Sequence, residues 1–161
     1  MKRLGYGQVE PNHLSAQRTG QIYAQLPAAS TIKVLENGEF VKYDYENGEV
    51  NKTGDGEWML VFNEVKLYDG YKTYKDFALK GDEIYPRVFK TNVGDIYTTN
   101  MVEKASTLPE TTLTDLAVGD DMGISANGYL TKNAQSDIQF KVVKVYTLAD
   151  GQPAVKVQRI A

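Results

Sequence analysis

The stretch from Ile138 to Ile160, IQFKVVKVYTLADGQPAVKVQRI, constrains the fold more than any other part of the chain. The pair Asp150-Gly151 lies between two runs that alternate apolar and polar residues, which is a strong signal for a β-hairpin. On the second run Val155 and Val157 alternate with polar residues, so one face of that strand is expected to be buried. A lone hairpin is only marginally stable in water, so this one requires further strands to cover it.

The first run of this hairpin changes phase in its middle. Phe140 and Val142 share one face, whereas Val143 and Val145 share the other. One extra residue in an antiparallel strand shifts the alternation in this way. We therefore predict a β-bulge at this point.

The rest of the sequence contains short β-like runs separated by turn residues. Asn-Gly and Asp-Gly steps recur, and they supply the positive backbone angles that tight hairpin turns require. The run Trp58 to Phe62 is apolar on both faces and is expected to be a central, covered strand. Ile84 to Phe89 contains Pro86, which cannot donate to a ladder, so an edge strand is predicted there. Ile96 to Thr99 is a further short strand, and residues 71–80 fit either a short helix or an irregular loop.

This pattern predicts a mainly β protein, a small antiparallel β-barrel or sandwich built from short hairpins, with an extended N-terminal arm. The 161 residues suit one domain or two small ones. We expect an arm over residues 1–30, a hairpin-rich subdomain over 31–83 and a small β-barrel over 84–161. The last two parts are alternatively one continuous β-domain.

Residues 1–30 differ from the rest because their apolar side chains are sparse and follow no single period. Such a segment is expected to bury its apolar side chains on another surface. One interpretation is an arm that becomes ordered on a partner, and the alternative is an arm that lies on its own domain. Arg18 is the expected charged anchor, because its planar guanidinium group can hold a carboxylate of the partner. The predicted contact residues are Leu4, Tyr6, Val9, Pro11, His13, Leu14, Arg18, Ile22, Tyr23 and Leu26.

The sequence offers little catalytic or metal-binding chemistry. His13 is the only histidine and there is no cysteine, so neither a zinc site nor a nucleophile–base pair is expected. The pair Asp120-Asp121 is typical of a solvated turn and lacks the spacing of a calcium loop, although two acidic turns meeting in space could hold Ca²⁺. We therefore expect no enzyme activity, no cofactor and no metal.

The formal net charge is −3 and no cluster of Lys and Arg appears, which argues against a nucleic-acid partner. No apolar run is long enough to span a membrane, and the first residues lack the apolar core of a signal peptide. We expect no membrane partner and synthesis in the cytoplasm. The 11 tyrosines suit half-buried sheet faces and interfaces, and a carbohydrate platform is an alternative use.

Four long stretches carry a family resemblance: LGYGQVEPNHLSAQRTGQIYAQLPAA, VLENGEFVKYDYENGEVNKTGDGEWMLVFNEVKLYD, YPRVFKTNVGDIYTTN and VVKVYTLADGQPAVKVQRIA. Through them the chain resembles a family of small virion structural proteins of tailed bacteriophages. The resemblance covers nearly the whole chain apart from about residues 100–135. It implies an auxiliary, or decoration, protein on the outer surface of the capsid, and it brings no catalytic motif.

On this resemblance the expected partner is the major capsid protein, and other copies of the same protein on the shell are a further expected contact. The arm would staple adjacent major capsid proteins on the exterior of the virion, after assembly in the host cytoplasm. Repetition on a lattice would add avidity to contacts that are individually modest. Alternative functions are a head-fibre base, a neck or tail component, and a carbohydrate-binding β-module for adhesion to the host.

Overall fold

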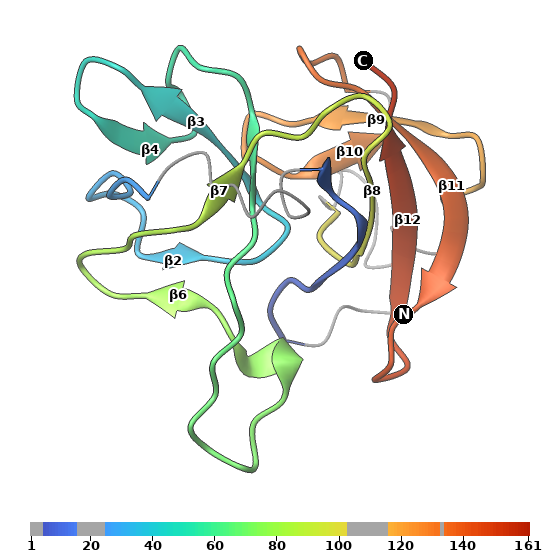
Figure 1. The fold of residues 1–161 in the computed structure, drawn as a ribbon, viewed down its shortest axis with the longest axis horizontal. Coiled ribbons are helices and arrows are strands. Elements are labelled where there is room, and N and C mark those ends of the chain that lie inside the picture. Colours follow the sequence, from blue (N-terminus) through green and yellow to red (C-terminus); the bar gives the residue numbers. More distant parts are fainter. Residues whose placement is uncertain (1–4, 16–24, 103–115, 133) are drawn as a thin grey trace.

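The computed structural model describes residues 5–15, 25–102, 116–132 and 134–161 (Figure 1). In these residues the protein is mainly β, and the named strands pair antiparallel, as predicted. The strands are β1 (Val9–His13), β2 (Val34–Leu35), β3 (Phe40–Asp44), β4 (Glu49–Asn51), β5 (Met59–Val61), β6 (Leu79–Lys80), β7 (Val88–Phe89), β8 (Ile96–Thr99), β9 (Asp121–Ile124), β10 (Leu130–Lys132), β11 (Phe140–Thr147) and β12 (Pro153–Arg159), with a 3₁₀ turn η1 (Tyr74–Asp76) before β6.

Within the described residues these strands form three sheets. A six-stranded sheet has the order β1-β8-β12-β11-β9-β10, a four-stranded sheet the order β4-β3-β5-β7, and β2 pairs with β6 alone. Because β1 and β10 are edge strands, the largest sheet stays open. The arrangement is therefore sandwich-like, and of the two predicted architectures the closed barrel is not formed.

The four-stranded sheet is covered on both faces, because successive side chains of β3 and β5 pack into two different apolar clusters. In β5, Leu60 packs into a cluster with the six-stranded sheet, whereas Met59 and Val61 pack into a second cluster with β2 and β6. In β3, Phe40 and Val41 divide between the clusters in the same way. Successive side chains of a strand point to opposite faces, so a run that is apolar throughout fits only this middle layer. The predicted central, covered strand is confirmed.

The predicted C-terminal hairpin is confirmed as β11 and β12, which pair from Phe140↔Arg159 to Thr147↔Pro153. The register shifts between Val142 and Lys144, which is where the sequence predicts the bulge. Val142, before this shift, is 1% exposed, whereas Val143 within it is 36% exposed and Val145 after it is 44% exposed. The bulge thus turns the apolar side chains that follow it outward.

The shorter predictions also have clear outcomes. β8 has the predicted bounds Ile96–Thr99. β7 is an edge strand of the four-stranded sheet, but only Val88–Phe89 pairs and Pro86 lies before it. The segment 71–80 contains both the 3₁₀ turn η1 and the strand β6. β7 lies after residue 83 and pairs with β5, which lies before it, so this sheet crosses the predicted boundary between the two β parts.

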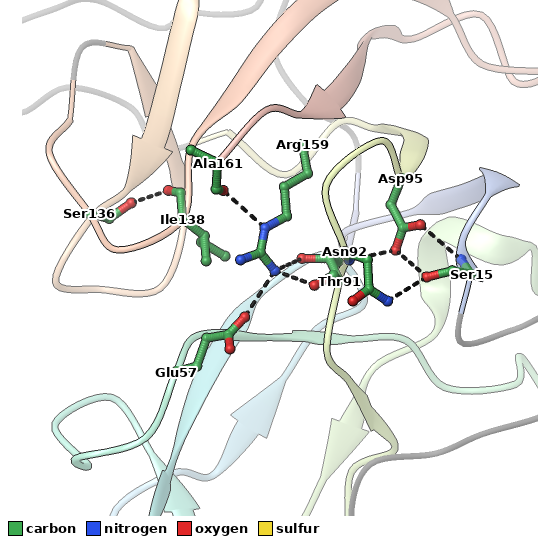
Figure 2. Close-up of polar contacts among 9 residues, drawn as sticks. All are labelled: Ser15, Glu57, Thr91, Asn92, Asp95, Ser136, Ile138, Arg159 and Ala161. Carbon is green, nitrogen blue, oxygen red and sulfur yellow. Dashed lines mark hydrogen bonds and ion pairs between the residues drawn. The ribbon is translucent and has the colours of Figure 1, made fainter.

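Two basic side chains, those of Arg159 and Lys52, connect the six-stranded sheet with the four-stranded sheet. Arg159 of β12 donates from Nη1 to Glu57 Oε1, which precedes β5, and to the carbonyl oxygen of Thr91 (Figure 2). Lys52, which follows β4, donates to the carbonyl oxygen of Phe40 at 3.0 Å, and its ammonium lies 5.7 Å from the ring centre of Tyr129. Polar cross-links therefore supplement the apolar contact between the six-stranded and four-stranded sheets.

The described part of the arm lies on its own domain. β1 pairs with β8, and Leu14 is 2% exposed within the cluster shared with the six-stranded sheet. Ser15 donates from its N–H and its hydroxyl to the carboxylate of Asp95, both at 3.0 Å, and it accepts from Asn92 Nδ2 (Figure 2). The interpretation that this segment finds no apolar contact in its own domain is wrong for residues 9–15. β1 pairs with the edge of β8, and Leu14 packs in the core.

Candidate protein-binding surface

A long loop between β5 and β6 projects from the body of the molecule (Figure 1). It carries Tyr68 and Tyr71, each 97% exposed, and Tyr74, which is 67% exposed. Tyrosine combines a large apolar ring with a polar hydroxyl, and it is enriched at protein interfaces. Three such side chains on one exposed loop are the most concentrated interface chemistry among the described residues.

Local hydrogen bonds give the tip of this loop a defined shape. Asp69 accepts from the N–H of Tyr71 through its carboxylate at 3.0 Å and from the N–H of Lys72 through its carbonyl at 3.1 Å. At the start of η1 the carboxylate of Asp76 accepts from the N–H of Thr73 at 2.8 Å and from its hydroxyl at 3.3 Å. The hydrogen bond from the Thr73 N–H is the largest factor that lowers the pKa of Asp76. The ionised carboxylate therefore holds this turn at neutral pH.

A cleft of about 600 Å³ lies between the arm and the base of this loop. One wall consists of residues 7–11, which include the first part of β1, and another consists of residues 62–65. Both wall segments are continuous in sequence. Tyr74 of the projecting loop also lines the cleft, so the loop and the cleft form one surface. The lining residues are Gly7, Gln8, Val9, Glu10, Pro11, Asn37, Phe62, Asn63, Glu64, Val65, Tyr74 and Ala149.

The two walls are joined through Glu36 and Asn37, which hydrogen-bond to one wall each. Asn37, which is 2% exposed, accepts at Oδ1 from the N–H of Asn63 at 2.7 Å and donates from Nδ2 to the Asn63 carbonyl at 3.1 Å. On the other side the N–H of Gly7 donates to Glu36 Oε2 at 2.6 Å. A Cβ at Gly7 would lie 2.3 Å from the Asn37 carbonyl oxygen, so glycine permits this close approach.

The cleft carries negative charge. Glu10 and Glu64 line it, and its described lining residues include no Lys or Arg. Lys66, which lies outside the lining, forms an exposed ion pair with Glu64 (Nζ to Oε2, 3.4 Å) and offsets part of that charge. Asp150 follows the lining residue Ala149 and accepts from Gln8 Nε2 at 3.1 Å. Partial burial raises the pKa of Asp150, but the hydrogen bonds from Gln152 and Gln8 outweigh this effect, and the net pKa is lowered. At neutral pH the site is therefore anionic and has apolar walls.

The structure separates the residues that the sequence predicts as contacts. Val9 and Pro11 line the cleft, and His13 is exposed on β1. The ring of Tyr6 lies 4.2 Å from the Lys80 ammonium, next to the base of the loop. Leu14 is in the core and Leu26 packs against the cluster with β2 and β6, so the prediction that Leu14 contacts a partner is wrong. Leu4, Arg18, Ile22 and Tyr23 lie outside the described residues.

Of the residues that line the cleft, the sequence predicted only Val9 and Pro11 as contacts. It missed the rest of this surface, including Tyr68, Tyr71, Glu64 and Ala149. The high tyrosine count was the one available signal, and it did not show which tyrosines are exposed. Tyr68 and Tyr71 are exposed because the loop between β5 and β6 is long. The cleft depends on pairing between β1 and β8, which lie far apart in sequence.

The described residues contain no group of three or more His, Asp or Glu side chains that could hold a metal ion. No helix in the same part of the chain is long and apolar enough to cross a membrane. Comparisons with protein-family models, with curated proteins and with solved structures found no match to this chain.

Proposed function

We propose that the protein is a structural component of a tailed-bacteriophage virion, which binds the outer surface of the capsid and connects adjacent major capsid proteins without a catalytic role. The observation that carries the proposal is the surface formed by Tyr68, Tyr71 and Tyr74 beside the apolar, anionic cleft. Exposed aromatic side chains on a shaped loop are typical of sites that bind another protein. The resemblance of the sequence to small virion proteins supplies the class of partner.

The acidic chain supports an external position. The net charge is −3, and electrostatic repulsion disfavours a position against packaged DNA. Contacts repeated over a capsid lattice add avidity, so one loop and one cleft per protein copy are sufficient for stable attachment. Binding only to the assembled shell would stabilise that shell by mass action.

The contact surface of this proposal differs from the arm that the sequence suggests. Residues 9–15 are held by β8 and Asp95, so they support one wall of the cleft and do not extend to a neighbouring subunit. The projecting loop takes the contacting role, since Tyr68 and Tyr71 are almost fully exposed.

The test is binding to capsid shells that lack the protein, followed by co-sedimentation. The double substitution Tyr68→Ser and Tyr71→Ser should weaken binding by about a thousandfold, because aromatic residues at interface centres contribute about 2 kcal/mol each and about 1.4 kcal/mol corresponds to tenfold. Tyr85→Ser is the matched control, since Tyr85 is 55% exposed and lies outside the cleft lining. Failure of the unaltered protein to bind shells, or its location inside the head or in the tail by cryo-EM, would refute the proposal.

A carbohydrate-binding module is a second candidate function, and the same exposed tyrosines favour it. Aromatic rings that stand free in solvent can stack on the apolar face of a sugar ring. A glycan array with the unaltered protein and the Tyr68→Ser, Tyr71→Ser variant distinguishes the two functions. Glycan binding that is lost in the variant would favour adhesion, whereas a silent array together with shell binding would favour the capsid function.

A further inference from the structure

We infer that the cleft beside β1 binds an extended peptide segment that carries Lys or Arg and belongs to a partner protein. The identification of that partner as a capsid protein rests on the proposed function, but the peptide chemistry is read from the cleft itself. The cleft has two long walls made of consecutive residues, 7–11 and 62–65. A cleft of about 600 Å³ between two backbone segments can take a short chain segment that runs along them.

Among the described residues β1 has a free strand edge at this site, because it is the terminal strand of the six-stranded sheet that they form. The N–H of Gln8 donates to Asn100 Oδ1 at 2.8 Å, and its carbonyl accepts from the Thr99 hydroxyl at 2.7 Å, so both groups face the β8 side. Backbone groups of successive residues in a strand point to opposite edges. The N–H and carbonyl of Val9 therefore face the free edge, where an added strand can pair with them.

Pro11 follows Glu10 and has no N–H to donate to an added strand. The register of β1 shifts between Glu10 and His13, which interrupts the edge beyond this point. Proline and irregular pairing are common protections of an exposed edge against uncontrolled strand addition. The usable edge is thus short and centred on Val9, so it suits a short peptide and not a second complete sheet.

Side-chain chemistry selects the kind of peptide. Val9, Pro11, Phe62 and Val65 line the cleft and are each partly exposed, so they can accept apolar side chains of the peptide. Glu10 and Glu64 supply negative charge, and the described lining itself contributes no Lys or Arg. The exposed Lys66 pairs with Glu64 from outside the lining at 3.4 Å, so a basic peptide competes with Lys66 for that carboxylate. Opposite charges near a strand edge attract the peptide, and they also fix its register and orientation. A peptide that alternates apolar and basic residues is complementary to both features.

The experiment measures fluorescence anisotropy of four labelled probe peptides with the full-length protein. The first alternates valine and lysine over six positions, and the second replaces each lysine by glutamate. The third and fourth are the first peptide with one or the other set of alternate backbone nitrogens methylated. The lysine peptide should bind, and its affinity should fall as salt is added. The glutamate peptide should not bind. At least one of the two methylated peptides should also fail to bind, because methylation removes the N–H groups that pair with the edge of β1.

Two substitutions test the location. Ala149 is exposed and lines the cleft, so Ala149→Trp should fill it and remove binding of the lysine peptide. Ala126→Trp is the matched control, because Ala126 is exposed in the turn between β9 and β10 and does not line the cleft. The fold of both variants is checked by their unfolding midpoints, which should stay at that of the unaltered protein.

Charge is tested in the same assay. Glu10→Gln with Glu64→Gln should weaken binding of the lysine peptide by about tenfold and flatten its salt dependence. Glu46→Gln, an exposed acid in the turn between β3 and β4, should change neither.

Binding that persists in Ala149→Trp, or no binding of the lysine peptide at all, would overturn the inference. The outcome is distinct from that of the proposed function. Loss of shell binding in the Tyr68→Ser, Tyr71→Ser variant without any peptide binding would overturn the cleft inference alone. Peptide binding at the cleft by a protein that never binds shells would uphold the inference and refute the capsid partner.

Discussion

Arg159 Nη1 lies 2.9 Å from Glu57 Oε1. This ion pair joins β12 of the six-stranded sheet to Glu57, which precedes Trp58 and β5. The side chain of Arg159 is 11% exposed and that of Glu57 is 34% exposed, so solvent screens the pair only in part. The same Nη1 also donates to the hydroxyl of Thr91 at 3.1 Å. One guanidinium group thus connects β12 of the six-stranded sheet to two segments that flank β5 and β7 of the four-stranded sheet.

From this arrangement we predict that Arg159→Met lowers the free energy of unfolding by about 2 kcal/mol, because hydrogen bonds to a charged group are lost and buried acceptors stay unpaired. Urea denaturation measures the change. Lys33→Met is the matched control, since Lys33 and Asp82 form a 3.0 Å pair with side chains 56% and 95% exposed. That change should cost less than about 1 kcal/mol. Equal effects of the two substitutions would show that the Arg159 pair has no special stabilising role.

Leu14 gives a second prediction, because it anchors the arm in the core. Leu14→Ala should destabilise the protein by about 2–5 kcal/mol through the loss of buried area and the cavity that remains. Val93→Ala, at a side chain that is 68% exposed, should change the stability by less than about 0.5 kcal/mol. Removal of the first 26 residues should likewise destabilise the β-domain, since it uncovers the edge of β8. A truncated protein that unfolds at the same urea concentration as the full chain would contradict this.

A substitution at Tyr97 is predicted to raise the free energy of unfolding, whereas the substitutions at Arg159 and Leu14 lower it. Its ring packs against Phe140, with centroids 5.9 Å apart, and its hydroxyl is buried without a hydrogen-bond partner among the described residues. Burial raises the pKa of Tyr97 well above its usual value. Tyr97→Phe removes the desolvated hydroxyl and should stabilise the protein by about 1 kcal/mol at neutral pH. Tyr85→Phe, at a side chain that is 55% exposed, is the control and should be neutral.

The alkaline limb of stability tests the same residue. A tyrosine whose folded pKa is raised contributes stability that is complete below the unfolded pKa, about 10, and is lost as the pH rises above it. The decline of the unfolding free energy above about pH 10 should therefore be shallower in Tyr97→Phe than in the unaltered protein. Parallel declines in the two proteins would show that the buried phenol does not titrate with unfolding.

The carboxylates of the turns predict loss of stability in acid. The side-chain amide of Asn47 is the largest factor that lowers the pKa of Asp44, and the N–H of Thr73 is the largest for Asp76. A lowered folded pKa contributes stability that is present above the unfolded value, about 3.9, and is lost as the pH falls through the folded value. Urea midpoints should hold from about pH 7 to about pH 5 and then fall.

Asp76→Asn should remove part of this acid-dependent loss, because the amide that replaces the carboxylate does not titrate. Glu46→Gln serves as the control, since Glu46 is an exposed acid of the β3–β4 turn. A stability profile for Asp76→Asn that follows the unaltered protein at every pH would contradict the role of this carboxylate.

The sequence by itself determined the local β structure of this protein. Asp150-Gly151 placed the hairpin, the phase change after Val142 placed the bulge, and the run from Trp58 to Phe62 marked the covered strand. Each of these features depends on the alternation of neighbouring side chains or on backbone angles at a turn, and neighbours in sequence are sufficient to define them.

Only the tertiary structure decided the position of the arm and the nature of the functional surface. Val9 pairs with Thr99 of β8, and Leu14 lies in a core cluster whose other buried members begin at Phe40. No local period in the arm encodes these contacts. The exposure of Tyr68 and Tyr71 and the joining of residues 7–11 with residues 62–65 into one cleft are likewise products of packing. Contacts between distant segments depend on the complete set of competing surfaces, which a pattern of neighbouring residues does not contain.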